Sequence, residues 1–103
     1  MTDTTHSPPL PKAIVTLSDA DTGAGSTQLR WRLRGVVMEG ACLVVVDVSD
    51  IDQLSSTLLA ALLDTHRVCR QCGGGLVIRH ASRKMTEYLR RTGLDRVFEV
   101  EAA

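Results

Sequence analysis

The run Leu43-Val44-Val45-Val46-Asp47-Val48 decides the fold class of this 103-residue chain. A nearly continuous apolar stretch is typical of a strand that is buried on both faces, as in a parallel sheet covered by helices. Residues 56–72 follow with apolar side chains at the helical period, and Gly73-Gly74-Gly75 supplies a stop for that helix. Leu76-Val77-Ile78 then predicts a second buried strand.

Apolar and capping patterns extend this alternation in both directions. Residues 12–17 are mostly apolar and β-branched, which indicates an early strand. Ser82 can cap a helix that ends at Gly93, and residues 97–100 predict a last short strand. Strands that alternate with helices predict a single-domain α/β sandwich. We expect a small, mainly parallel mixed sheet, about three helices and right-handed crossovers.

Residues 27–39 fit two kinds of secondary structure. Gln28–Arg34 alternates polar and apolar residues, which is typical of a strand. The apolar positions also fit one helical stripe, which consists of Leu29, Leu33, Val36 and Val37. Gly40 could end such a helix. At this length the pattern alone does not decide between the two.

Composition and charge argue against several function classes. The chain has 12 basic and 12 acidic residues, and this zero net charge argues against direct binding of nucleic acid. No uninterrupted apolar run is longer than six residues, far below the ~20 needed to cross a membrane, so we expect no membrane insertion. The N-terminus lacks the basic and apolar segments of a secretory signal. Residues 1–11 contain three prolines and predict a flexible arm, which leaves the folded domain at residues 12–103.

Three cysteines, Cys42, Cys69 and Cys72, make an odd number, which favours a reducing cytoplasm over a secreted disulfide framework. Cys69 and Cys72 have the spacing of a redox or metal pair, but they lie at the predicted end of a helix. The helix dipole disfavours a thiolate there. Zinc would need two more ligands, and only His66 and His80 are close in sequence, at irregular spacing. We predict structural thiols; a redox or metal protein is the less favoured alternative.

The sequence contains no dinucleotide-binding, phosphate-loop or nucleophile-elbow motif. Asp47, Asp50 and Asp52 lack the bidentate glutamate of a calcium loop and are typical of a turn after a buried strand. His66 falls on the apolar stripe of its helix, where a core histidine is commoner than a catalytic base. We therefore predict no catalytic residue, no cofactor, no metal site and no enzymatic activity.

Three hydroxyl residues, Ser55, Ser56 and Thr57, open the predicted helix after the first buried strand. A single hydroxyl is enough to cap a helix. Capping therefore leaves two of the three hydroxyls unexplained, and they become candidates for a functional role.

This junction resembles the STAS domain of bacterial anti-sigma factor antagonists. Members typically read Asp-Leu-Ser-Gly-Val-x-Phe-hydrophobic-Asp-Ser-Ser-Gly-Leu. The matching positions are Asp47, Ser49, Leu54, Ser56 and Leu59, while Thr57 takes the place of the phosphorylated serine. Ser55 replaces the family aspartate and Leu58 replaces the glycine.

Two further segments resemble the same family. Gly74-Gly75-Leu76-Val77-Ile78 is similar to its step from glycines into a strand, and Thr92-Gly93-Leu94-Asp95-Arg96-Val97-Phe98 is similar to a later helix end. The likeness runs over about residues 41–100. The family has a helix where residues 27–39 lie, so the resemblance favours the helix there.

The resemblance implies partner switching. The antagonist would bind an anti-sigma factor that is also an ATP-dependent serine kinase, phosphorylation would break the complex, and a phosphatase would restore it. The implied phosphorylation site is Thr57, with Ser56 as the second acceptor. The implied partner-binding residues are Asp50, Asp52, Gln53, Ser55, Ser56, Thr57 and Leu58. The alternative is a non-switching STAS interaction module in a larger cytoplasmic or transporter-associated assembly.

The charges are unevenly distributed along the chain. Residues 46–66 contain four aspartates and no Lys or Arg, whereas residues 67–96 contain eight basic residues against two acidic ones. The acidic part surrounds the hydroxyl triplet. Such a dipole orients a partner during encounter more than it sets the affinity.

Overall fold

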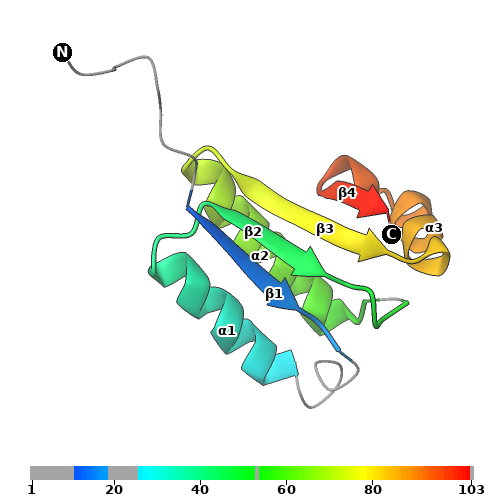
Figure 1. The fold of residues 1–103 in the computed structure, drawn as a ribbon, viewed down its shortest axis with the longest axis horizontal. Helices are drawn as coiled ribbons and strands as arrows, with labels where there is room; N and C mark the ends of the chain where they lie inside the picture. Colours follow the sequence, from blue (N-terminus) through cyan, green and yellow to red (C-terminus); the bar gives the residue numbers. More distant parts are fainter. Residues whose placement is uncertain (1–10, 19–25, 53, 103) are drawn as a thin grey trace.

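The computed structural model describes residues 11–18, 26–52 and 54–102, and they form one α/β domain (Figure 1). The elements follow one another as β1 (Lys12–Thr16), α1 (Ser26–Met38), β2 (Leu43–Asp47), α2 (Ser56–Gln71), β3 (Gly75–Ala81), α3 (Arg83–Thr92), a 3-10 turn (Leu94–Arg96) and β4 (Glu99–Ala102). The predicted fold class is confirmed. The boundary of the predicted arm stays untested for residues 1–10, which lie outside the described residues. The carbonyl of Pro11 is anchored, because it accepts hydrogen bonds from the amides of Cys42 and Leu43.

The described strands form a single sheet in the order β1-β2-β3-β4, and every neighbouring pair is parallel. One register row shows the arrangement: Ile14 pairs with Val45, Val45 with Val77, and Val77 with Glu99. β2 and β3 are therefore interior strands. The last strand begins at Glu99, two residues later than predicted, because the 3-10 turn occupies Leu94–Arg96.

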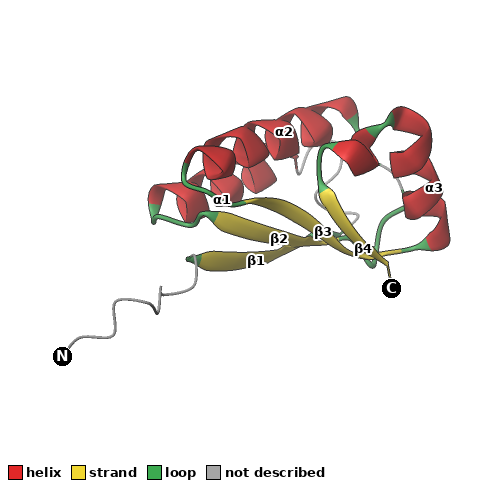
Figure 2. Cartoon of the chain, turned by 90° about the horizontal axis from the view of Figure 1, so that it is seen from above, coloured by secondary structure: helices red, strands yellow, loops and turns green. Residues whose placement is uncertain are grey.

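All three helices lie on the same face of the sheet (Figure 2). The strand order explains this arrangement: each crossover moves one strand in the same direction, and right-handed crossovers that do so stay on one face. The expectation that helices cover both faces of β2 is therefore wrong. Val44 and Val46 join the helix-packed core, whereas Val45 is buried on the other face, between Ile14 and Val77.

The core lies between the sheet and the helix layer. Its largest fully buried side chains come from both the sheet and the helices, namely Leu17, Leu29, Leu33, Val44, Val46, Leu58, Leu62, Leu76, Ile78, Met85, Leu89 and Phe98.

α1 settles the ambiguous segment as a helix. Leu29 and Leu33 of the predicted stripe are buried in the core. Gly40 then takes a left-handed conformation at φ 100°, and the amide of Ala41 donates to the carbonyl of Val36. This hydrogen bond closes the helix end in the way a glycine at that position allows.

The cysteines do not follow the prediction of free structural thiols. Cys42 and Cys72 form a disulfide, with their Cα atoms 5.7 Å apart, and only Cys69 is free among the cysteines. The pairing of Leu43 with Gly75 brings the residues before these two strands together. Gly74 completes the approach, because a Cβ there would overlap the carbonyl of Cys42. Cys69 is buried, and burial raises the pKa of its thiol.

A buried charge tests the position of β2 in the sheet. Val45→Asp places a carboxylate at a site that is 3% exposed, and we expect it to cost several kcal/mol of the ~5–15 kcal/mol available to a small domain. Ile14→Asp is the matched control, because Ile14 is the neighbour of Val45 in register but is 55% exposed. Urea unfolding measures both variants. Equal stability losses would contradict the interior position of β2.

Reduction of the disulfide tests the cysteine pairing. The two half-cystines are 30 residues apart, and closing a loop of that length stabilises a fold by about 3.5 kcal/mol on the chain-entropy account. We expect dithiothreitol to lower the free energy of unfolding of the wild type and to leave that of Cys42→Ser unchanged. A wild type that is insensitive to reductant would restore the prediction of free thiols.

Candidate functional site

The loop between β2 and α2 is fixed to the domain by apolar side chains. Val48, Ile51 and Leu54 are all less than 10% exposed and belong to the core. The polar residues between these anchors, Ser49, Asp50 and Asp52, face solvent. The loop therefore presents its polar groups from a fixed base. Gln53, a predicted partner-binding residue, lies outside the described residues.

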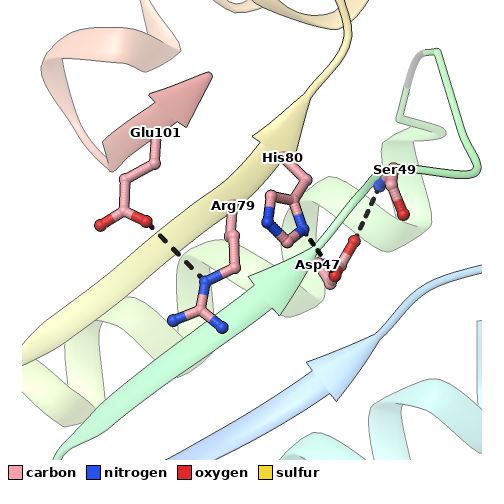
Figure 3. Close-up of polar contacts among 5 residues, drawn as sticks. All are labelled: Asp47, Ser49, Arg79, His80 and Glu101. Carbon is pink, nitrogen blue, oxygen red and sulfur yellow. Dashed lines mark hydrogen bonds and ion pairs between the residues drawn. The ribbon is translucent and has the colours of Figure 1, made fainter. Parts of the chain in front are cut away.

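Asp47, the last residue of β2, organises the beginning of the loop (Figure 3). One carboxylate oxygen accepts a hydrogen bond from the amide of Ser49 at 2.9 Å, and the other lies 2.9 Å from Nδ1 of His80. Hydrogen bonds from the backbone and side chain of Ser49 lower the pKa of Asp47, and His80 lowers it further. Asp47 is therefore ionised and accepts hydrogen bonds from both sides.

His80 reaches Asp47 through an unusual backbone conformation near the end of β3. Among the described non-glycine residues, it alone has a positive φ, at 60°. The sheet register between β3 and β4 is irregular at the same place. Arg79, one residue earlier, instead forms an ion pair with Glu101 of β4, with 3.8 Å between Nε of Arg79 and Oε1 of Glu101 (Figure 3). Adjacent side chains of β3 thus tie this strand to both neighbours.

The far part of the loop is held by α3. The hydroxyl of Ser82 donates to Asp52 at 3.1 Å and accepts from the amide of Met85, so one side chain caps α3 and binds the loop. The hydroxyl of Tyr88 donates to the carbonyl of Leu54 at 3.3 Å. A cavity of about 450 Å³ lies beside these contacts, lined by Asp52, Lys84, Glu87, Tyr88 and Arg91.

The three hydroxyl residues at the start of α2 divide into two groups. Ser55 is the N-cap, and its Oγ accepts a hydrogen bond from the amide of Leu58 at 3.1 Å. Ser56 and Thr57 are exposed, and neither hydroxyl forms a hydrogen bond within the described part of the chain. The capping requirement is therefore met by Ser55 alone, and two hydroxyls face solvent at the positive end of a 16-residue helix.

The structure brings most of the predicted site residues to one edge of the domain, but not all of them. Asp50, Asp52, Ser56 and Thr57 are exposed around the start of α2, and Ser55 is half-buried under its capping bond. Leu58 is wrong as a partner-binding residue, because its side chain is fully buried in the core.

Sequence reasoning missed the part of this edge that α3 contributes. Ser82, Lys84, Tyr88 and Arg91 lie about 30 residues further along the chain than the loop that they border. The only local signal was the capping pattern at Ser82, which predicted its role in the helix and not its bond to Asp52.

The remaining candidate groups serve the fold. Nδ1 of His66 accepts a hydrogen bond from the amide of Leu76 at 3.0 Å, and the ring meets Phe98 edge-on. Burial, with the nearby charge of Arg70, lowers the pKa of His66 and favours the neutral ring that this bond requires. Within residues 11–18, 26–52 and 54–102, no group of three or more His, Cys, Asp or Glu side chains could hold a metal ion. No helix in these ranges has the length and apolar character needed to cross a membrane.

Comparisons with known proteins agree with this architecture. The family model described as MlaB, STAS domain, matches residues 10–100. The solution structure of protein TM1081 superposes with a TM-score of 0.75 at 16% identity, over 95% of this chain and 84% of that one. A crystal structure of TM1081 from Thermotoga maritima, described as a candidate anti-sigma factor antagonist, gives a TM-score of 0.69 at 15% identity, over 89% and 74% of the two chains. No curated protein sequence matches.

A charge-only substitution tests the role of Asp47. A depressed carboxyl pKa stabilises the fold above the unfolded pKa of about 3.9, and that stabilisation is lost as the pH falls through the folded value. At pH 7 we expect Asp47→Asn to cost about 1 kcal/mol, the difference between charged and neutral hydrogen bonds. Denaturant unfolding of the wild type and of Asp47→Asn, at pH 7 and near pH 3, measures this cost. The difference between their free energies of unfolding should be smaller near pH 3 than at pH 7. A constant difference would mean that the charge is unimportant.

Proposed function

Because the chain belongs to the STAS-domain family, we propose that it is an anti-sigma factor antagonist that docks its partner through the edge around the start of α2. The observation that carries the proposal is the division of the hydroxyl triplet. Ser55 caps the helix, while Ser56 and Thr57 face solvent and form no hydrogen bond with another described residue. The protein would act by binding, without catalysis, and its partner would be an anti-sigma factor of the ATP-dependent serine kinase type.

The anchored loop supports docking at this edge. Its apolar residues are buried, Asp52 is bound to Ser82 at the start of α3, and Asp47 at the end of β2 is bound to His80 of β3. A surface that is already ordered loses little conformational entropy when a partner binds. Asp50 and Asp52 make the loop part of this edge acidic, whereas Lys84 and Arg91 of α3 border it, so a basic face of the partner would dock on the loop.

Phosphorylation at Thr57 would act on the interface and not on the fold. A phosphate adds about −1.5 to −2 charges at neutral pH. In the free protein the start of α2 tolerates this charge because of the helix dipole. In the complex the same charge would be desolvated beside Asp50 and Asp52, which repel it. A phosphatase would reverse the change by restoring the neutral hydroxyl.

A non-switching STAS interaction module is the second candidate. Leu58, at the position of the family glycine, is fully buried, so it does not provide the close backbone approach that a glycine allows. Ser55, in place of the family aspartate, removes a charge beside the acceptor. In addition, the matching family model carries the description MlaB and not that of an antagonist. In this case the same edge would bind a partner constitutively.

Variants of Thr57 separate binding from folding. We expect Thr57→Glu to melt like the wild type, because a negative charge in the first turn is favourable by ~0.3–1 kcal/mol. Its affinity for the anti-sigma factor should fall about thirtyfold or more, which corresponds to ~2 kcal/mol for a charge desolvated at an interface. The partner is first captured from the native cells on the wild-type chain, identified by mass spectrometry and purified. Its affinity is then measured by calorimetry.

Two controls accompany this measurement. Gln71→Glu adds the same charge to an exposed site at the other end of α2 and should bind normally. Thr57→Ala should bind normally but should not respond to the kinase and ATP. If Thr57→Glu binds the anti-sigma factor as tightly as the wild type, the switch is wrong and the non-switching module is the better description. If no anti-sigma factor is captured, the antagonist function itself is wrong.

A further inference from the structure

A second surface of the domain, apart from the edge around the start of α2, carries an apolar groove. The groove runs between α1 and α2, has a volume of about 360 Å³ and is lined by residues that include Arg30, Trp31, Arg34, Ala61, Asp64 and Val68. It lies along the bodies of the two helices and does not include the exposed hydroxyls at the start of α2. The groove is therefore separate from the proposed switch.

Trp31 marks the groove as a binding surface. This residue is the only tryptophan in the chain, lies off the buried stripe of α1 and is 67% exposed. Val68, on the opposite wall, is 41% exposed. Clustered exposure of large apolar side chains beside arginine is typical of interaction sites, where tryptophan and arginine contribute most of the binding energy.

The rim of the groove is basic. α1 contains three arginines and no acidic residue. The guanidinium of Arg34 lies 6.0 Å from the centre of the Trp31 ring, which it can hold by a cation–π contact, and Arg30 lines the same wall. Among the described lining residues of the groove, Asp64 alone is acidic, and its Oδ1 lies 3.7 Å from a guanidinium nitrogen of Arg67 in an ion pair. The described residues that line the groove therefore carry a net positive charge.

The shape and the charge together select the occupant. A groove between two helices accepts a third, amphipathic helix through apolar side chains at positions i, i+3, i+4 and i+7. A small molecule would need to be largely enclosed, whereas the wall formed by Trp31 stands mostly in solvent. A symmetric dimer through this face would bring Arg30 and Arg34 of two copies together, and like charges would oppose it.

We propose that the α1–α2 groove is a docking site for an amphipathic helix of a protein partner, with an apolar stripe flanked by acidic residues. Trp31 and Val68 hold the apolar stripe. Arg30 and Arg34 pair with the flanking carboxylates. This partner helix binds at a place from which the start of α2 stays accessible, so it is a second interaction surface in addition to the proposed switch edge.

A displayed library of short helical peptides tests the proposal. Every member has leucine at positions i, i+3, i+4 and i+7, and the other positions carry Glu, Gln or Lys. The full chain is the bait. We expect the selected peptides to be enriched in Glu beside the leucines, and to shift the emission of Trp31 to shorter wavelength when they bind.

Charge-reversal variants of the groove test the proposal more directly. The affinity of the double variant Arg30→Glu/Arg34→Glu for the selected acidic peptides should be at least about tenfold lower than that of the wild type. The same variant should instead bind peptides in which Lys replaces Glu. The matched control Arg90→Glu/Arg96→Glu makes the same change of net charge on the exposed face of α3 and the 3-10 turn, and should bind like the wild type. Trp31→Ala should lose binding by a similar factor while it melts like the wild type, because the side chain is exposed.

Several outcomes would overturn the proposal. These are a library without enriched binders, enrichment without a bias toward Glu, or binding that is indifferent to Trp31→Ala. Self-association of the wild type that Trp31→Ala abolishes, measured by analytical ultracentrifugation, would assign the groove to a second copy of the chain. None of these results depends on Thr57, so failure here leaves the proposed switch unaffected, and failure of the switch leaves the groove unaffected.

Discussion

The parallel pairing of β2 with β3 is the constraint on which the rest of the structure depends. Asp47 stands opposite Arg79 in register, so the segments that follow the two strands leave the sheet at the same edge. The loop before α2 therefore meets the start of α3, although about 30 residues separate them along the chain. The same pairing acts at the opposite edge, where Cys42 meets the turn before β3 and is joined to Cys72. One register thus determines both the candidate docking edge and the disulfide.

This arrangement separates the groups that hold the loop from the groups that face a partner. Buried apolar residues and the Asp47–His80 and Asp52–Ser82 contacts fix the loop, and Ser55 satisfies the helix start. Thr57 contributes to none of these contacts. Chemistry at its hydroxyl can therefore change the charge of the surface without removing any interaction that stabilises the domain. A switch that works in this way needs no conformational change, because the interface itself is the element that is altered.

Local patterns predicted the parts of the fold that local forces determine. The helical period, the cap at Ser82 and the glycine stop at Gly93 were readable because each depends on residues within one or two turns, whereas the choice of Ser55 as the cap of α2 needed the structure. The disulfide and the His80 contact were not readable, since their partners are 30 and 33 residues away in sequence. Leu58 shows a different failure. The helical period of α2 placed its side chain inward. The family resemblance aligned it with a glycine at an interface and so assigned it to the partner surface. The structure buries the side chain in the core.

The loop before α2 and the α1–α2 groove carry opposite charges on a chain whose net charge is zero. Asp50 and Asp52 surround the start of α2, whereas Arg30 and Arg34 border the α1–α2 groove. Because the net charge is zero, the protein as a whole does not attract a charged partner over long distances. The separated charges mainly orient the partner as it approaches. In the two proposals, a basic partner surface would be guided to the loop and an acidic helix to the groove. The same separation makes each surface repel the other's partner, so two different proteins can be recognised by one small domain without competing for a common site.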